Sequence, residues 1–301
     1  MQMNTPPRST IRLTRRGRVA LIATGAVVAA TAVAVPLLTL TMEGEEKRPT
    51  SLVIPEGWRT GQVYEAVDKA LALPLGSTKK SLAKANLKLP SDAEGNPEGY
   101  LYPATYRLDR TATPESLLAQ MVNTANKKFR GSPVTAGAQR NAMNVYQAVT
   151  IASIIQSEAA TKPDMAKVAR VIFNRLERGM PLQMDSTLNY ALNRFTLSTT
   201  TNDTKLESPY NSYQRMGLPP TPIANPGEDA MRAAINPTPG DWLYFVTVKP
   251  GDTRFTASYE EHQRNVAEFN LLRRRASPST TSSNSTSTAV PGSPSAASAA
   301  R

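Results

Sequence analysis

A glutamate at the end of an apolar helical segment is the side chain best suited to acid–base chemistry. Three isoleucines precede Glu158 by three, four and seven residues, a spacing that stacks side chains on one side of a helix. They are Ile155, Ile154 and Ile151. Apolar neighbours desolvate a carboxyl group, which then keeps its proton to a higher pH and can act as a general acid near neutrality. The competing interpretation is an ordinary solvated glutamate at a helix end.

The sequence lacks the residues that most other catalytic mechanisms require. Cysteine is absent and His262 is the single histidine. A zinc site usually gathers His and Cys ligands, and a Ser–His pair needs His262 beside an activated serine, so both are disfavoured. We therefore expect no metal and no cofactor, which leaves carboxylate chemistry. His262 shares a helical stripe with Tyr259 and Val266, which favours a packed or surface histidine over a chemical role.

Further polar side chains are candidates for the same site. Asp185 in LQMDST is either a second catalytic acid or the cap of a helix that begins at Ser186, and the cap is favoured. Segment 208–227 is rich in Pro, Asn and Tyr and predicts a long ordered loop, which is either a cleft wall around Met216 and Gly217 or a rigid surface loop. Its Tyr, Asn and Gln side chains offer sugars hydrogen-bonding groups and flat faces. They are Tyr210, Asn211, Tyr213 and Gln214.

Capping and stop signals predict the elements that hold these residues. The helix of Glu158 is expected to run from about Asn141 and to end before Pro163, so Glu158 lies in its last turn. Asp164 is expected to cap the next helix, which Gly179 ends. Because a helix end beside a loop stays accessible, the carboxyl group remains reachable despite its apolar neighbours.

The remaining segments predict an α+β fold. The part from 51 to 108 indicates a β-α-α-β unit, with Thr60 as the cap of its first helix. Downstream we expect a helix at 114–129 capped by Thr113, a polar loop at 130–139, a helix at 228–235, a hairpin of 242–249 with 254–256, and a last helix from Ser258 to Leu272.

An uncharged stretch at 19–40 is long enough to cross a bilayer. It has 22 residues, and roughly 20 are needed at ~1.5 Å of rise per residue. The basic segment 1–18 precedes it, so the positive-inside rule predicts a single-pass cell-membrane protein with its N-terminus in the cytoplasm and its body outside. A cleaved signal peptide is the alternative, although its apolar region would usually be 7–15 residues long.

The formal net charge of +11 is concentrated at the two ends. Segment 1–18 carries five arginines and segment 273–301 carries four, both without an acid, which leaves +2 for the middle. Basic ends on a nearly neutral body argue against nucleic acid as a partner. Residues 276–301 are almost wholly Ser, Thr, Ala, Pro and Gly, a composition that predicts disorder.

Five runs of residues follow one another along the chain: ASIIQSEAA, VARVIFNRLERGMPLQMDSTLNYAL, SPYNSYQRMGLPPTPIANPG, LYFVTV and EEHQRNV. In their order and spacing they resemble the MltG/YceG-like endolytic murein transglycosylases over about residues 98–270. Upstream, IPEGWRTGQV and EGYLYPATY resemble the family's LysM-like membrane-proximal module. The position of Glu158 is similar to that of the family's catalytic glutamate. The resemblance implies weaker roles, as supports or sugar contacts, for Asn174, Gln183, Asp185, Tyr210, Asn211 and Tyr213.

Two positions depart from the family pattern. Members often carry an acid two residues before the catalytic glutamate, where this chain has Gln156. Gln156 and Ser157 either hydrogen-bond to the carboxyl group or a substrate, or face water. Many relatives are expected to have a histidine near Thr253, which this chain lacks.

The resemblance implies cleavage of the MurNAc–GlcNAc β-1,4 bond within peptidoglycan strands, with 1,6-anhydroMurNAc as the product. One carboxyl group suffices, because the sugar's own 6-hydroxyl is the nucleophile. An anchored body lies where new strands emerge, so we expect nascent peptidoglycan as substrate and peptidoglycan synthases as neighbours. Two rival classes are a non-catalytic peptidoglycan-binding protein and a division scaffold.

The predicted organisation has six parts. They are a cytoplasmic basic tail (1–18), a transmembrane helix (19–40), a linker (41–50), a LysM-like module (51–108), a mixed helix/strand transglycosylase catalytic domain (109–272) and a disordered tail (273–301).

Overall fold

The computed structural model describes residues 50–195 and 199–276, and the described residues from Ser51 onward belong to one compact unit. The predicted basic tail, the membrane-spanning segment and most of the linker lie outside the described residues, as does the segment 277–301. None of the helices within the described ranges combines the length and hydrophobicity needed to span a bilayer.

The unit begins with the predicted β-α-α-β order, and the whole fold is α+β as expected. Strand β1 pairs antiparallel with β2, with Leu52 opposite Tyr106. Helix α2 begins at Thr60 with Arg59 as its N-cap, so the prediction of Thr60 as the cap is wrong. The elements are β1 (Ser51–Val53), α2 (Thr60–Ala70), α3 (Ser77–Ser81), the 3-10 turns η1 (Leu82–Lys84) and η2 (Ser91–Ala93), and β2 (Thr105–Arg107).

Helix α4 (Pro114–Phe129) has the predicted cap, because the Thr113 hydroxyl accepts a hydrogen bond from the amide of Ser116 at 3.2 Å. The next segment, predicted as a polar loop, is helix α5 (Ser132–Arg140). Its proline lies in the first turn, where no intrahelical hydrogen bond is lost. Its glycine allows close packing, since a Cβ atom at Gly137 would lie 2.6 Å from Ile235.

Helix α6 (Val145–Glu158) ends at Glu158, so the prediction that this residue lies in the last turn is confirmed. It begins later than predicted because Asn144 caps it, accepting a hydrogen bond from the amide of Gln147 at 2.8 Å. Helix α7 (Lys162–Glu177) has Thr161 as its N-cap, so Asp164 is not the cap. The Asp164 carboxylate instead accepts a hydrogen bond from the Thr161 hydroxyl at 2.7 Å.

The C-terminal part is a small helix, a long loop, a second short helix, a hairpin and a final helix. Segment 208–227 contains no helix or strand, as predicted, and Phe245 lies opposite Phe255 in the hairpin. The last helix extends four residues past the expected end at Leu272. The elements are α8 (Asp185–Ala191), η3 (Asp203–Lys205), α9 (Glu228–Ile235), β3 (Tyr244–Lys249), β4 (Asp252–Thr256) and α10 (Tyr259–Ala276).

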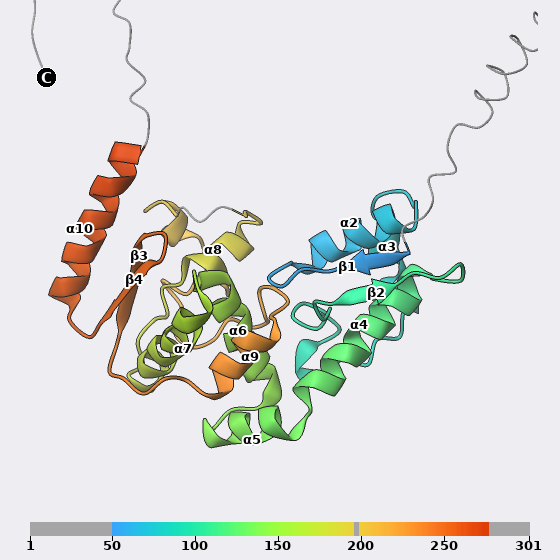
Figure 1. The fold of residues 1–301 in the computed structure, drawn as a ribbon, viewed down its shortest axis with the longest axis horizontal. Helices are drawn as coiled ribbons and strands as arrows, with labels where there is room; N and C mark the ends of the chain where they lie inside the picture. Colours follow the sequence, from blue (N-terminus) through green and yellow to red (C-terminus); the bar gives the residue numbers. More distant parts are fainter. Residues whose placement is uncertain (1–49, 196–198, 277–301) are drawn as a thin grey trace, which may run out of the picture. The chain divides into compact units, whose positions relative to one another are not determined.

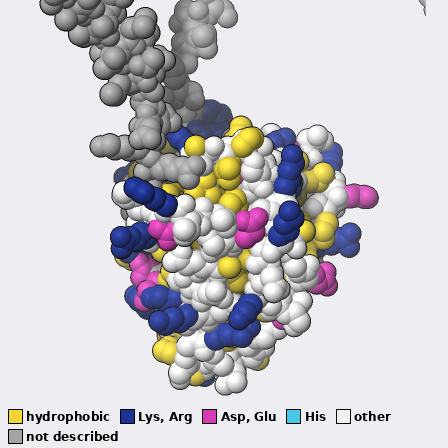
Figure 2. All heavy atoms as spheres, turned by 90° about the vertical axis from the view of Figure 1, so that its right-hand side faces the viewer, with side chains coloured by type: hydrophobic (Ala, Val, Ile, Leu, Met, Phe, Trp, Pro, Cys, Tyr) yellow, Lys and Arg dark blue, Asp and Glu magenta, His cyan; other side chains and the backbone are white. Residues whose placement is uncertain are grey.

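Helix α6 lies at the centre of this arrangement. It contacts α5, α7, α8 and α9, while β3 contacts β4, α7 and α10 (Figure 1). On the face shown in Figure 2, Lys and Arg side chains stand apart from one another with Asp and Glu among them, and they do not form a continuous stripe. The basic side chains on that face are therefore not arranged as a track for phosphates.

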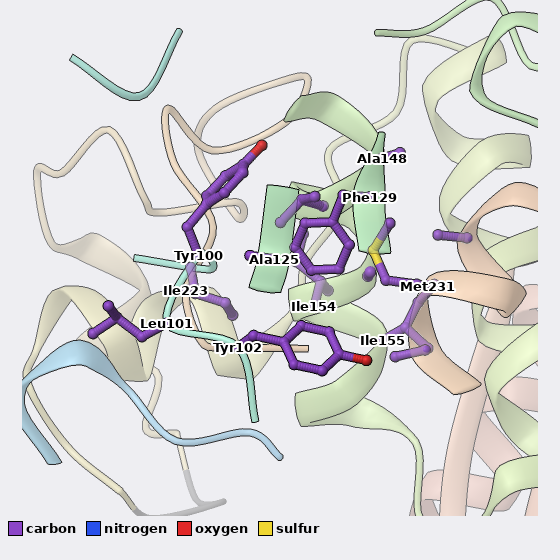
Figure 3. Packing of buried hydrophobic residues seen from close by; sticks show 14 of the residues in the cluster. Tyr100, Leu101, Tyr102, Ala125, Phe129, Ala148, Ile154, Ile155, Ile223 and Met231 are labelled. Atoms are coloured by element: carbon purple, nitrogen blue, oxygen red, sulfur yellow. The ribbon is translucent and has the colours of Figure 1, made fainter. Parts of the chain in front are cut away.

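A continuous hydrophobic core joins the first part of the unit to α6. The ring of Phe129 packs at its edge against Tyr100 and Tyr102, with centroid distances of 5.7 and 5.8 Å. Ile154 and Ile155 of α6, both 0% exposed, pack in the same cluster (Figure 3). This core crosses the predicted boundary at 108, so residues from before and after that boundary both pack against α6.

The core tolerates no side chain at Gly99. Its φ of +83° is a left-handed conformation, and a Cβ atom there would lie 2.5 Å from Pro222. We expect Gly99→Ala to lower the free energy of unfolding by about 2–4 kcal/mol, because backbone strain and overpacking add.

Gly95→Ala is the matched control, since Gly95 has φ +82° with open space around it. Its cost should be about 1–2 kcal/mol from strain alone. Equal losses in urea unfolding would contradict the steric account.

Candidate active site

A cleft of about 1770 Å³ has Glu158 in its wall. Its other walls come from segment 182–186 with the start of α8, from β3, and from α10. The first part of the unit also contributes, through Gly57 and Arg59. A helix end, a loop and a hairpin from distant parts of the sequence thus enclose one space.

The Glu158 residue is half-buried and lines this cleft, and protein atoms surround most of its carboxyl group. The isoleucines one turn and two turns behind it are at most 1% exposed. Burial raises the pKa of Glu158, hydrogen bonding from Ser186 opposes that rise, and the negative charge of Asp185 adds to it. The carboxyl group is therefore suited to carry a proton at a higher pH than a solvated glutamate does.

The first turn of α8 holds Glu158 in place. Glu158 Oε1 accepts a hydrogen bond from the backbone amide of Ser186 at 2.9 Å. Ser186 is the second residue of α8, so Glu158 takes a position that a capping side chain usually takes. The Ser186 hydroxyl is buried and, with the amide, opposes the rise in the pKa of Glu158. The orientation of Glu158 is thus fixed by backbone 28 residues away.

Asp185 is not the cap of α8, so that preferred interpretation is wrong. Asp185 is the first residue of the helix, and its side chain caps no backbone amide. Its Oδ1 accepts a hydrogen bond from the Tyr213 hydroxyl instead. Asp185 lines the cleft, and its negative charge contributes to the raised pKa of Glu158.

Removing the charge of Asp185 should shift the pH dependence of catalysis. Asp185→Asn keeps an acceptor for Tyr213 but removes a negative charge that raises the pKa of Glu158. A general acid must be protonated in the free enzyme, so kcat/KM falls as pH rises through its pKa. We expect this fall to begin at a lower pH in the variant.

Asp164→Asn is the control for that experiment. Asp164 accepts from the hydroxyls of Thr161 and Thr253, does not line the cleft and does not contribute to the raised pKa of Glu158. Its profile should match the wild type. An Asp185→Asn profile with an unchanged or higher alkaline limb would refute the electrostatic role of Asp185.

The structure brings four of the predicted site residues to the cleft. Gln183 has a φ of +51°, its backbone amide donates to the Ser212 carbonyl at 2.9 Å, and its side chain is exposed. The amide of Met184 donates to the Ser212 hydroxyl at 2.9 Å. These bonds attach segment 182–186 to the long loop. The four residues are Glu158, Gln183, Asp185 and Tyr213.

Three other predicted residues do not line the cleft. The side-chain amide of Asn174 donates to the carbonyls of Gly240 and Trp242, at 3.2 and 2.8 Å. The side-chain amide of Asn211 donates to the carbonyls of Thr204 and Leu206, at 3.0 and 2.7 Å. The Tyr210 hydroxyl shares a 2.9 Å hydrogen bond with that of Thr221. These contacts indicate that the three residues stabilise the loops and do not contact a sugar directly.

The two positions that depart from the family pattern have internal partners. Gln156 Oε1 accepts from the amide of Gly227 at 2.9 Å, which links α6 to the start of α9. The Thr253 hydroxyl donates to Asp164 at 3.1 Å and also contacts the hydroxyl of Thr247. Neither Gln156 nor Thr253 lines the cleft.

His262 lies in the cleft wall, stacked on Tyr244 with ring centroids 5.1 Å apart. It is packed, as the sequence favoured. Burial, followed by the positive charge of Arg175, lowers the pKa of His262, and its Nδ1 has no hydrogen-bond partner among the described residues. The exposed Met216 and the half-buried Gly217 do not line the cleft, which favours a surface loop at that position.

Sequence reasoning missed several residues of the cleft. Arg175 directly follows Asn174, and Ser186 directly follows Asp185, so the motifs contained both. The motifs do not show that Arg175 lacks an acidic partner, or that the Ser186 amide donates to Glu158. Nothing in the sequence marked Arg59 as a cleft residue except its place in the upstream module. Within the described ranges, no group of three or more His, Asp or Glu side chains could hold a metal ion.

Comparisons with known proteins agree on one family. The sequence model of the YceG-like family matches residues 16–268. A protein named endolytic murein transglycosylase from Streptococcus pneumoniae (strain D39) is 34% identical in an alignment of 259 residues that covers 76% of this chain and 46% of that protein. One of the same name from Bacillus subtilis is 37% identical over 168 residues, 56% of this chain and 46% of that protein.

A solved structure is similar over most of the described chain. It is a protein described as yceG-like from Listeria monocytogenes, 30% identical, with a TM-score of 0.64 over 76% of this chain and 79% of that one. The chain spans about half the length of the curated relatives that it matches.

Proposed function

Because this chain belongs to the YceG-like family, we propose that it is an endolytic lytic transglycosylase of peptidoglycan. It cleaves the MurNAc–GlcNAc β-1,4 bond within glycan strands and leaves 1,6-anhydroMurNAc ends. The observation that carries this proposal is Glu158, a carboxyl group desolvated at the end of a core helix, fixed by the Ser186 amide and open to a large cleft.

One carboxyl group can perform both proton transfers of this reaction. Protonated Glu158 donates its proton to the glycosidic oxygen as the bond from C1 of MurNAc to that oxygen breaks. The resulting carboxylate then accepts the proton of the MurNAc 6-hydroxyl, whose oxygen attacks C1 of the same sugar. Glu158 ends the cycle protonated, and no water is consumed.

A hydrolase is the second candidate, because Asp185 is another carboxylate in the cleft. Glycoside hydrolases generally use two carboxyl groups, the second as nucleophile or as base for a water molecule. Two observations favour the transglycosylase. Asp185 Oδ1 is occupied by the Tyr213 hydroxyl, and the named relatives are murein transglycosylases.

The size and lining of the cleft support a glycan strand as substrate. Its volume of about 1770 Å³ exceeds the ~300–1,000 Å³ of a typical small-molecule pocket, so it has room for several sugar residues. Aromatic side chains offer flat faces to sugar rings. Those of the cleft wall are Phe195, Tyr213, Tyr244, Phe245, Tyr259 and Phe269.

The cellular setting is part of the proposal. The uncharged stretch 19–40 after a basic segment supports a retained single anchor, with the catalytic unit outside the cell membrane. Such a protein would act on nascent strands beside peptidoglycan synthases. The β-α-α-β unit at 51–108 would be a LysM-like module, which contributes Gly57 and Arg59 to the cleft.

The test is the product formed from purified glycan strands by the full chain. Mass spectrometry should find anhydro-ended fragments whose early lengths are broadly distributed, as cleavage within strands requires. A non-catalytic binding protein would retain strands without forming such ends, and a scaffold would retain few strands. Absence of anhydro ends with the wild type would refute the proposed activity.

A further inference from the structure

Arg175 is a buried cation in the cleft wall without an acidic partner. It is 6% exposed and lines the same cleft as Glu158. None of the ion pairs within the described ranges includes it. Arg254, in contrast, is paired with both Asp252 and Glu268.

Carbonyl groups fix the guanidinium of Arg175 but leave one nitrogen unused. Nε donates to the Leu243 carbonyl at 2.7 Å, and Nη1 donates to the carbonyls of Leu182 at 2.6 Å and Pro181 at 3.2 Å and to Gln183 Oε1 at 3.3 Å. No hydrogen bond from Nη2 to another described residue is found. Four hydrogen bonds thus hold the side chain in place, and none of them uses Nη2.

The carbonyl groups satisfy hydrogen bonds but do not neutralise the charge. Burial lowers the pKa of Arg175, an effect that Tyr244 and Tyr213 partly oppose. An arginine stays protonated even so, and a buried charge without a counter-ion is costly. An anion bound in the cleft would supply the missing partner in a water-poor setting, where charged hydrogen bonds are strong.

Arg175 lines the same cleft as the candidate catalytic group. The charges of both Glu158 and Arg175 affect the pKa of Tyr213, which also lines the cleft. The Tyr244 ring lies 5.2 Å from the guanidinium. The described charged residues that line the cleft include five basic and two acidic ones, which are Arg59, Arg175, Arg194, Lys249, Arg273, Glu158 and Asp185.

We propose that Nη2 of Arg175 binds a carboxylate group of the substrate. This inference rests on the proposed function, because it takes the glycan strand as the ligand. The sugar rings of peptidoglycan are uncharged, and its carboxylates are carried by the lactyl arm of MurNAc. In a bare strand the lactyl carboxylate itself is free, and in a substituted strand the stem peptide carries the carboxylates. Arg175 therefore selects MurNAc that bears an acid over neutral sugars.

The experiment measures binding, so that it does not depend on turnover. The full chain with Glu158→Gln is the parent, and Arg175→Gln and Arg170→Gln are each added to it. Arg170 is the matched control, because it lies on α7, donates from Nε to the Thr238 carbonyl at 2.9 Å and does not line the cleft. Circular dichroism verifies that each variant is folded.

Three soluble tetrasaccharide fragments serve as ligands, all with acetylated amines. The first carries stem peptides with free carboxylates, the second carries the same peptides with amidated carboxylates, and the third has no peptide and free lactyl carboxylates. Calorimetry gives the dissociation constant of each. We expect the parent to bind at least one acidic fragment about ten- to hundredfold more tightly than the amidated one.

Arg175→Gln should reduce that preference to near one, while Arg170→Gln should keep it. Preference for the first fragment alone assigns the stem peptide, and preference for the third assigns the lactyl group. A parent that binds all three fragments equally would overturn the proposal. So would an Arg175→Gln variant that binds all fragments more weakly by one common factor, as a merely structural arginine predicts.

The two proposals fail in different ways. If the wild type forms no anhydro ends but the preference depends on Arg175, the carboxylate site stands and the enzymatic function fails. If anhydro ends form and the preference is absent, the carboxylate site fails alone.

Discussion

Glu158→Gln is expected to lower kcat/KM for the formation of anhydro ends by about a thousandfold or more. Each general acid–base step contributes about 10²–10⁴-fold, and Glu158 serves in both proton transfers. Glutamine keeps the shape of the side chain and its acceptor for the Ser186 amide, but it cannot exchange a proton. Steady-state rates on purified strands measure the effect.

Glu177→Gln is the matched control. Glu177 ends α7 as Glu158 ends α6, but it is exposed and does not line the cleft. Its replacement should change the rate by less than about twofold, as a surface change far from the chemistry does. Comparable losses in the two variants, or a Glu158→Gln enzyme within tenfold of the wild type, would remove Glu158 from the mechanism.

Glu158→Gln should also make the fold more stable at high pH. Because the pKa of Glu158 is raised in the folded protein, the wild type loses stability as pH rises from the unfolded pKa through the folded pKa. The glutamine variant has no such loss, so its advantage in unfolding free energy should grow over that window. A site that costs stability for the sake of chemistry behaves in this way.

Glu98→Ala is expected to lower the free energy of unfolding by about 3 kcal/mol or more. Glu98 is 4% exposed and accepts hydrogen bonds from the Thr60 amide at 3.0 Å and the Tyr190 hydroxyl at 3.2 Å. Removal leaves the buried Thr60 amide without this acceptor, takes an acceptor from the half-buried Tyr190 hydroxyl and opens a cavity. For a unit of this size the melting temperature should fall by about 6–12 °C, which scanning calorimetry measures.

Glu98→Gln separates lost contacts from lost charge. Burial raises the pKa of Glu98, so its ionised form is a cost at high pH that glutamine avoids. Glutamine also keeps an acceptor for Thr60, and its loss should therefore be well below that of alanine, most clearly above neutral pH. Equal losses for the two variants would contradict this account. Because Tyr190 lies on α8, whose first turn holds Glu158, this carboxyl group also supports the active site.

Local signals in the sequence predicted the helix that carries the site. The isoleucine spacing before Glu158 and the stop signal at Pro163 depend on neighbours within a few turns, and the structure has both the helix end and the desolvated carboxyl group there. The helix after Thr113 was predicted in the same way, from the capping residue that precedes it. Such features need no knowledge of the tertiary fold.

The errors arose where a distant group replaced a local one. Asp185 has the sequence of a cap, but the structure makes it the first residue of α8, and its carboxylate accepts a hydrogen bond from the distant Tyr213 hydroxyl. Segment 130–139 has the glycine and proline of a loop, but its packing against Ile235 makes it a helix. Tertiary contacts override such local preferences.

Arg175 could not be recognised from the sequence for a related reason. Its carbonyl partners include Leu243, which is 68 residues away, and its lack of an acidic partner becomes visible only in the folded chain. The motif around it shows a charged residue on a helix, which is usually a solvated one.

The reaction in water enriched in oxygen-18 tests the central claim most directly. If Glu158 works alone and the sugar supplies its own nucleophile, the new MurNAc ends are 1,6-anhydro sugars, lighter by one water than reducing ends, and they contain no oxygen-18. Reducing ends that carry oxygen-18 at C1 would show that water is the nucleophile, and the account of a single carboxyl group would be wrong.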